Sequence, residues 1–343
     1  MINSKLIYKI LGQLLFIEAF LLFVSLLVAF YYQQDDIFAF IVATLTTIGG
    51  GLVLKWRGHG ADNSMSRRDA YLVVTLSWIV FSFFGTLPFM ISGYINNFTD
   101  AYFETMSGFT TTGATILDDV ECFPHGLLFW RSLTQFVGGM GVLVFVIVFI
   151  PKNDKMSTAL AKAEIPGPQF GKIVSKLRFT SLILYAIYIV MTFILVGILC
   201  ALKMPVFDSF CHAFSTASTG GFSVKAASIA HYNSVGIEVT LTIFMLLFSV
   251  NFTVYYLILI GQFVKAIRNE ELIWFFTIFA AAVALIVANL MASKTYTSFG
   301  TALKDAAFNV SSLMSTSGFG TADYTKWPVF SRIVLFAVMC IGG

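Results

Sequence analysis

Long apolar runs separated by short polar breaks organise the whole chain. A membrane-spanning helix needs about 20 consecutive, mainly apolar residues, and several runs approach or reach that length. They cover residues 7–30, 37–55, 70–94, 127–150, 178–201, 236–262, 272–292 and 329–343. This pattern predicts seven complete spans and an eighth that the end of the chain cuts short.

Three shorter, half-apolar segments lie between some of these spans, at residues 99–110, 207–217 and 304–315. Each segment is too short to cross a bilayer. We therefore expect surface loops or re-entrant helices at these places, and an all-α polytopic membrane protein as the fold class.

The composition agrees with a membrane protein. Of the 343 residues, 58% are hydrophobic and only 11% are charged, whereas soluble domains carry about 25% charged residues. The net charge of +3 is too small to indicate a nucleic-acid partner, so membrane lipid is the expected environment. The four cysteines lack CxxC or CxxH spacing, which favours buried apolar thiols over metal or redox chemistry.

Lysine and arginine are concentrated in alternate loops, at residues 55–68, 152–178 and 263–271. Cytoplasmic loops of membrane proteins carry an excess of these residues. The three basic loops are therefore predicted to be cytoplasmic, which puts all three short apolar segments on the outer side.

A motif recurs three times, at intervals of about a hundred residues, within these outer segments. The copies are DAYFETMSGFTTTGAT (100–115), DSFCHAFSTASTGGFS (208–223) and DAAFNVSSLMSTSGFGT (305–321). Each runs from an aspartate to a hydroxyl residue followed by glycine: Thr112–Gly113, Thr219–Gly220 and Ser317–Gly318. The aspartate-to-glycine distances are 13, 12 and 13 residues. The repeating unit is span, half-helix, glycine loop, span.

Such a unit can bind a cation. Non-helical backbone exists at membrane depth only where it is buried in protein or lines water. Rings of backbone carbonyls can replace the hydration shell of a permeating cation, and glycine permits the positive φ that aligns successive carbonyls. A single such stretch is usually an ordinary loop, but three matched copies favour pore loops. The candidate ion-binding residues are Thr111, Thr112, Gly113, Thr219, Gly220, Thr316, Ser317 and Gly318.

The acidic residues of the motif have more modest expected roles. Asp100, Asp208 and Asp305 are interpreted as helix N-caps, with attraction of cations as a compatible second role. Glu104 either accepts hydrogen bonds behind the first glycine loop or lies at a lipid or solvent boundary. None of the four histidines is interpreted as a ligand.

The loops TTTGAT, STGGFS and STSGFGTADY, with WRSLTQFVGGMGV after the first, resemble the Trk/Ktr/HKT superfamily of potassium transporters, and most closely the membrane subunits of bacterial Trk systems. The resemblance covers essentially the whole chain. It implies four span–pore-helix–filter-loop–span units around a central pore, K⁺ as the transported ion, and a multi-pass protein of the bacterial cytoplasmic membrane. Glycine at residue 113, where sodium-preferring relatives have serine, favours K⁺.

The resemblance also divides the chain. Residues 1–68 form two extra N-terminal spans, 69–151 the first pore-loop unit, 152–262 a basic cytoplasmic linker with the second unit, and 263–343 the third unit. Aligning Pro124 with Pro328 sets Gly138 opposite Gly342, so the third unit is cut in its second span. We therefore expect three of four units, and the N-terminal portion of a longer protein.

The functional expectation is K⁺ uptake through a backbone-carbonyl filter, without enzymatic activity. The chain has no nucleotide-binding fingerprint, so the resemblance implies gating by a cytosolic nucleotide-binding regulatory subunit of the TrkA type, with residues 152–178 as a docking surface or simply a positive-inside loop. Relatives also form homodimers. The alternative is a symporter coupled to Na⁺ or H⁺ with a midplane site, but these repeats look parallel rather than inverted.

Serine substitutions distinguish the two functions. Replacing Gly113, Gly220 or Gly318 by serine should alter ion selectivity if these residues line a filter, because filter geometry sets which ion is coordinated. A carrier site elsewhere in the chain predicts little change. Ion flux through each variant, with K⁺ and Na⁺ as competing ions, is the measurement.

Overall fold

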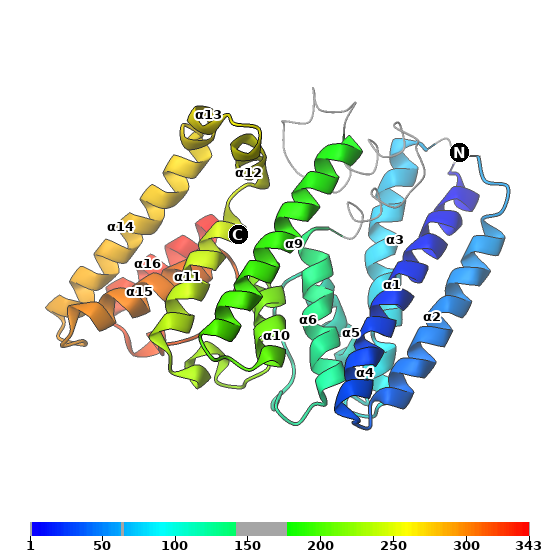
Figure 1. Cartoon of the computed structure of the whole chain (residues 1–343), viewed down its shortest axis with the longest axis horizontal. Coiled ribbons are helices and arrows are strands. Elements are labelled where there is room, and N and C mark those ends of the chain that lie inside the picture. Colours follow the sequence, from blue (N-terminus) through cyan, green and yellow to red (C-terminus); the bar gives the residue numbers. More distant parts are fainter. Residues whose placement is uncertain (1, 63–64, 142–176, 343) are drawn as a thin grey trace. The chain divides into compact units, whose positions relative to one another are not determined.

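Helices account for all the regular structure in the computed structural model, which describes residues 2–62, 65–141 and 177–342 (Figure 1). No β-strand occurs within these ranges. The predicted all-α membrane fold is therefore confirmed. The chain divides into two compact units, Met1–Tyr185 and Ala186–Gly343.

The first unit is built around α1, which lies beside α2, α3 and α6. Leu14, Leu15 and Leu22 of α1 are fully buried, whereas Phe20 on the same helix is 64% exposed, as expected for a lipid-facing side chain. The helices of this unit are α1 Ser4–Tyr32, α2 Ile37–Arg57, α3 Arg67–Gly85, α4 Leu87–Ile91, α5 Phe98–Phe109 and α6 His125–Gly139.

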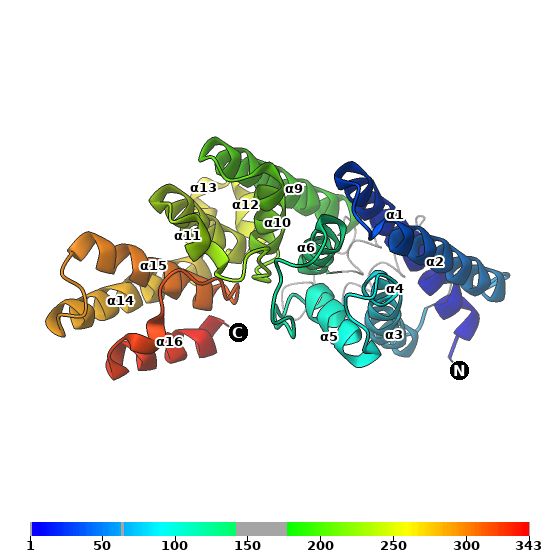
Figure 2. The same ribbon diagram turned by 90° about the horizontal axis from the view of Figure 1, so that it is seen from below.

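In the second unit, α14, α15 and α16 lie side by side (Figure 2), and α11 contacts both α10 and α15. Ile286 of α14, Val310 of α15 and Leu335 of α16 meet in one hydrophobic core. The elements are α9 Leu177–Ala201 (from residue 186 on), α10 Val206–Ala217, η3 Ser228–Tyr232, α11 Val235–Ser249, α12 Phe252–Leu259, α13 Phe263–Ile267, α14 Glu270–Ala292, α15 Phe299–Met314, η4 Tyr324–Lys326 and α16 Val329–Gly342.

Five described helical segments are long and apolar enough to cross a membrane, and α11 with α12 makes a sixth if the bent pair counts as one span. The expected span at 127–150 is helical as far as Gly139, and residues 142–150 lie outside the described ranges. α16 is a shorter apolar helix. The five segments are Ser4–Tyr32, Ile37–Arg57, Arg68–Ile91, Leu182–Ala201 and Glu270–Ala292.

The expectation of one continuous span at 236–262 is wrong. α11 ends at Ser249, and α12 starts at Phe252 with its axis turned by 87°. The Asn251 side chain accepts a hydrogen bond from the Thr253 amide at 3.0 Å, which starts a new helix. The Tyr255 hydroxyl donates to the Leu247 carbonyl at 2.6 Å. Local side-chain hydrogen bonds thus stabilise the break.

The three short apolar segments are helices: α5, α10 and α15. Our interpretation of their aspartates as N-caps is wrong, because the capping residues are Asn97, Pro205 and Ser298. An N-cap must have non-helical backbone at the start of the helix. The aspartates lie inside the helices instead, where Asp208 accepts a hydrogen bond from Tyr232 and Asp305 accepts one from Tyr296.

The cysteines only partly match the expected buried thiols. All are free; Cys211 is buried and Cys200 is half-buried. Cys122 and Cys340 are exposed, the latter on α16. A thiol on an apolar helix can face lipid without cost, so the exposure of Cys340 does not indicate reactivity.

Glycines bring α1 and α2 close together. A Cβ atom at Gly12 would lie 2.8 Å from the Lys55 amide nitrogen and 2.9 Å from the Gly51 carbonyl oxygen. Small residues allow such close approach of membrane helices, which then gain van der Waals contact. A Cβ atom at Gly49, also on α2, would meet nothing within 4 Å.

Gly12→Ala should therefore lower the thermal unfolding midpoint, whereas Gly49→Ala should leave it unchanged or raise it slightly through helix propensity. Forcing a methyl group against backbone atoms typically costs about 1–3 kcal/mol. Thermal unfolding of both variants in detergent checks this. If the two variants had equal unfolding midpoints, the close contact of α1 and α2 at Gly12 would contribute nothing to stability.

Candidate functional site

A threonine with left-handed backbone lies two residues after the end of each of the three short helices. The φ values are 55° at Thr111, 54° at Thr219 and 60° at Thr316. A β-branched residue rarely adopts positive φ, and the strain costs about 1–3 kcal/mol. The same strained turn occurs at the start of three loops, which we name the first loop (110–116), the second loop (218–223) and the third loop (315–320).

The first two turns are Schellman motifs. The Thr112 amide donates to the Ser107 carbonyl at 3.0 Å, and the Gly220 amide donates to the Ser215 carbonyl at 2.9 Å. Glycine usually takes the left-handed position of this motif, but here threonine does. In the third loop the Gly318 amide donates to the Ser312 carbonyl at 3.2 Å. The loop amides therefore satisfy carbonyls at the helix ends.

A second left-handed residue follows two positions later, and it changes the register expected for the second loop. Its φ is 71° at Gly113, 74° at Gly221 and 74° at Gly318. The equivalent of Gly113 is thus Gly221, not Gly220 as the hydroxyl–glycine pairing predicted. Gly221 follows Asp208 by 13 residues, so all three copies have the same spacing.

Backbone contact joins the second and third loops. A Cβ atom at Gly221 would lie 1.5 Å from the Ser317 carbonyl oxygen, so only glycine fits there. The Gly320 amide donates to the Ser228 hydroxyl at 3.2 Å, and the Ala230 amide donates to the Gly320 carbonyl at 3.2 Å. Two of the three predicted loops therefore lie together, and the first loop belongs to the other compact unit.

Glu104 holds the first loop from behind, which resolves the alternatives that its position in the sequence left open. This carboxylate is buried and accepts hydrogen bonds from Arg131 Nε at 2.5 Å, from the Thr115 hydroxyl at 3.0 Å and from the Ile116 amide at 3.2 Å. The Ser107 hydroxyl also donates to the Ala114 carbonyl at 2.6 Å. A buried ion pair thus holds the extended segment that follows Gly113 in place.

His212 occupies the position behind the second loop that Glu104 occupies behind the first, a role that sequence reasoning missed. Its Nε2 lies 3.0 Å from the Ser223 hydroxyl and its Nδ1 lies 2.8 Å from the Asp208 carbonyl. Because a carbonyl only accepts, we assign the proton to Nδ1. The signal was present in the repeat, since Glu104, His212 and Asn309 each follow the motif aspartate by four residues.

The helices after the first and third loops pack against the ends of the helices before them. A Cβ atom at Gly138 would lie 1.9 Å from the Phe109 carbonyl oxygen, and one at Gly342 would lie 2.3 Å from the Met314 carbonyl oxygen. The alignment of Pro124 with Pro328 had set these two glycines opposite each other. The same close contact occurs at both.

A cavity of about 540 Å³ in the second unit reaches Thr219 and Thr316. Its other walls are mainly apolar, with Phe248, Trp274 and Ile341 among them, and Glu271 is its acidic residue. No group of three or more His, Cys, Asp or Glu side chains suitable for a metal ion occurs in the described part of the chain.

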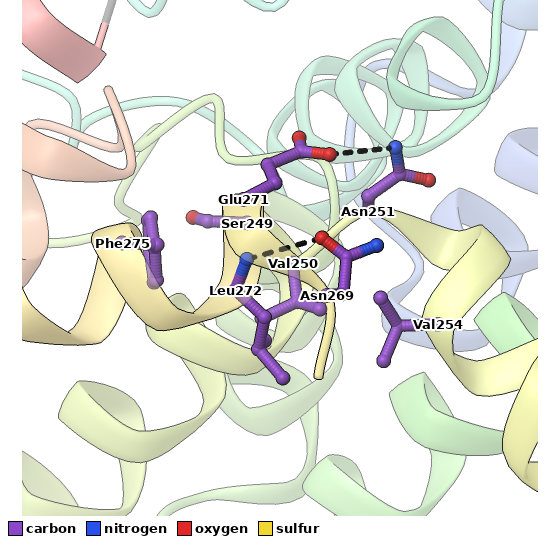
Figure 3. A pocket seen from close by; sticks show the side chains of 8 residues that line it. All are labelled: Ser249, Val250, Asn251, Val254, Asn269, Glu271, Leu272 and Phe275. Atoms are coloured by element: carbon purple, nitrogen blue, oxygen red, sulfur yellow. Dashed lines mark hydrogen bonds between the residues drawn. The ribbon is translucent and has the colours of Figure 1, made fainter. Parts of the chain in front are cut away.

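A smaller pocket lies where α11 breaks (Figure 3). Glu271 points toward Asn251, whose amide donates to Glu271 Oε2 at 3.3 Å. Asn269 caps α14 by accepting from the Leu272 amide at 3.3 Å. These contacts tie the bend of α11 and α12 to the start of α14.

Comparison with known proteins gives one consistent result. The TrkH family, described as cation transport proteins, matches residues 34–343. Trk system potassium uptake protein TrkH of Salmonella typhimurium is 32% identical, covering 99% of this chain and 71% of the relative. TrkG of Escherichia coli is 30% identical with the same coverage. The crystal structure of the potassium transporter TrkH from Vibrio parahaemolyticus matches with a TM-score of 0.85 and 28% identity, over 97% of this chain and 69% of that chain.

Replacing the arginine of the buried Arg131–Glu104 pair should destabilise the compact unit Met1–Tyr185. Arg131→Met leaves Glu104 buried without its charged partner, which typically costs about 3–5 kcal/mol. Adding Glu104→Gln to this variant should recover part of the loss, because the uncompensated charge is then gone. Unfolding in detergent measures both variants.

Lys326→Met is the matched control, because the Lys326–Asp323 pair is exposed to solvent and such pairs contribute little. An Arg131→Met variant as stable as this control would contradict the role given to Glu104.

Proposed function

Because the chain belongs to the TrkH family of cation transport proteins, we propose that it takes up potassium ions through a selectivity filter lined by main-chain carbonyl oxygens. It is a multi-pass protein of the bacterial cytoplasmic membrane. Its relatives are named as potassium uptake proteins, which supports K⁺ as the transported ion.

The observation that carries the filter proposal is the repeated backbone geometry of the loops. Each loop has a left-handed threonine, one intervening residue and a left-handed glycine. Strained backbone conformations concentrate at binding sites, where the surrounding structure maintains them. Three copies of the same strained pattern favour a shared role in coordination over three unrelated turns.

The proposed ligands follow from this register. They are carbonyl oxygens of the three residues in each pattern, with threonine and serine hydroxyls adding oxygen where they occur. Gly220 remains a proposed carbonyl ligand at the intervening position, equivalent to Thr112 and Ser317, but it offers no hydroxyl. The full set is Thr111, Thr112, Gly113, Thr219, Gly220, Gly221, Thr316, Ser317 and Gly318.

Such a site matches K⁺ chemistry. A monovalent cation loses its hydration shell in the filter and regains oxygen contacts from the carbonyls, and the C-terminal ends of α5, α10 and α15 add partial negative charge. The membrane potential contributes about 2.3 kcal/mol per 100 mV for each charge. Uptake therefore needs no energy-coupling domain in this chain.

We further propose that a cytosolic nucleotide-binding subunit of the TrkA type regulates the pore, and that the protein works as a homodimer. Its relatives are named as parts of Trk systems, which supports a regulatory partner. The basic segment 152–178, proposed to contact that partner, lies almost wholly outside the described residues.

The register of the second loop makes a sharp prediction. Gly221→Ser should reduce K⁺ uptake by at least about tenfold and weaken selectivity over Na⁺, because it strains a left-handed residue by about 1–3 kcal/mol and collides with Ser317. Gly220→Ser, which the hydroxyl–glycine register predicted to alter selectivity, should instead be tolerated in this register, because Thr112 and Ser317 already have side chains at the equivalent position. Rubidium flux into proteoliposomes, with and without competing Na⁺, is the assay.

Gly261→Ser is the control for strain alone, since Gly261 has φ 77° and open space around it. It should leave selectivity unchanged. If Gly220→Ser abolishes uptake while Gly221→Ser does not, the register is wrong. If neither variant alters flux, the filter proposal itself is overturned.

A further inference from the structure

Glu18 is a buried acid that the proposed transport pathway does not use. It occupies the midpoint of α1, a 29-residue apolar helix long enough to cross the membrane. The residue is 0% exposed. Neither carboxylate oxygen has a hydrogen-bond partner among the described residues. Ionisable residues inside a membrane are costly and commonly functional.

The carboxyl group lies where three other helices meet. A Cβ atom at Gly85, the last residue of α3, would be 3.2 Å from Glu18 Oε1, 2.8 Å from Thr105 Cγ2 and 3.0 Å from Phe109 Cε2. Thr105 and Phe109 belong to α5, the helix that ends at the first loop. Trp130 of α6 donates its indole N–H to the Gly85 carbonyl at 2.9 Å. Glu18 thus borders the junction that supports α5.

Among the described residues, no Lys, Arg or His side chain forms an ion pair or hydrogen bond with Glu18. On α6, Arg131 is already bound to Glu104; Asp69 on α3 accepts from the Asn3 amide at the far end of that helix. The charged and titratable residues on the elements around Glu18 are Lys55 and Arg57 on α2, Arg67, Arg68, Asp69 and Tyr71 on α3, Asp100, Tyr102 and Glu104 on α5, and His125 and Arg131 on α6. The two bases of α2 lie in its last turn, and the two arginines and the aspartate of α3 lie in its first turn.

We propose that Glu18 is a proton-binding site, and that its bound proton keeps α5 and the first loop in their transport-competent position. An isolated buried carboxylate is so unfavourable that the group stays neutral or draws in water. Ionisation would bring water or a cation into the Gly85 junction, and α5 would have to move. Regulation of the first loop rests on the proposed function, whereas proton binding does not.

Infrared spectroscopy tests the proton directly. The full-length protein in lipid should show the carbonyl stretch of a protonated carboxylic acid, and Glu18→Gln should remove that band. Glu238→Gln is the matched control, because Glu238 is buried but paired with Lys304 at 2.5 Å; this variant should keep the band. A wild-type spectrum without the band would overturn the proposal, whatever the uptake activity.

The pH dependence of uptake tests the regulation. Once Glu18 ionises, wild-type rubidium uptake should fall by about tenfold for each further pH unit, because the protonated fraction falls in that proportion. The infrared band should be lost over the same pH range. Glu18→Gln, which is permanently neutral and of similar shape, should fold, transport at neutral pH and not show this fall.

The other possible results separate the regulatory role of Glu18 from the proposed function. A pH profile of Glu18→Gln that matches the wild type, or a band that disappears without any change in uptake, would overturn the regulatory role. Absence of wild-type uptake at every pH would count against the proposed function instead, and the infrared result would still decide whether Glu18 binds a proton.

Discussion

Every backbone polar group that leaves a helix inside an apolar protein must find another partner. An unsatisfied group in hydrocarbon costs several kcal/mol, so this chain can form its three loops only where amides are capped and the following strand is supported. The left-handed threonines direct the loop amides back onto helix carbonyls. In the proposed filter, the remaining loop carbonyls would bind the ion.

The support behind the loops differs from copy to copy, although the loops repeat. Glu104 with Arg131 supports the first loop, and His212 with Ser223 supports the second. In the third copy, Asn309 takes the position of Glu104 and His212 and donates to the Asp305 carbonyl at 2.9 Å. The Ser312 hydroxyl donates to the Phe319 carbonyl at 2.7 Å, as the Ser107 hydroxyl does to Ala114 in the first copy. Different side chains can therefore hydrogen-bond to the polar groups of the segment that follows the left-handed glycine. The backbone pattern is therefore preserved within the chain while the side chains behind it vary.

The same constraint explains the other interruptions. At the break between α11 and α12, Asn251 and Tyr255 satisfy the freed backbone groups. At the break between α3 and α4, Trp130 bonds to Gly85. Glu18 lies at this second junction without a partner of its own in the described structure. Among the buried carboxylates that the structure describes, Glu18 differs in that neither of its oxygens has a hydrogen-bond partner.

The sequence alone predicted the all-α membrane fold, most of the span positions and the family, because these depend on run length and on motifs within a few residues. The domain boundaries and the ion-binding role of the loops remain predictions. Only the tertiary structure decided that Gly221 rather than Gly220 takes the left-handed position, and that Glu104 and His212 lie behind their loops. It also revealed the 87° break after α11. These features depend on which distant residues touch: Gly221 must be glycine because Ser317 lies against it, and Glu104 is buried because Arg131 pairs with it. No local pattern encodes such a contact, since its energy exists only once the chain has folded.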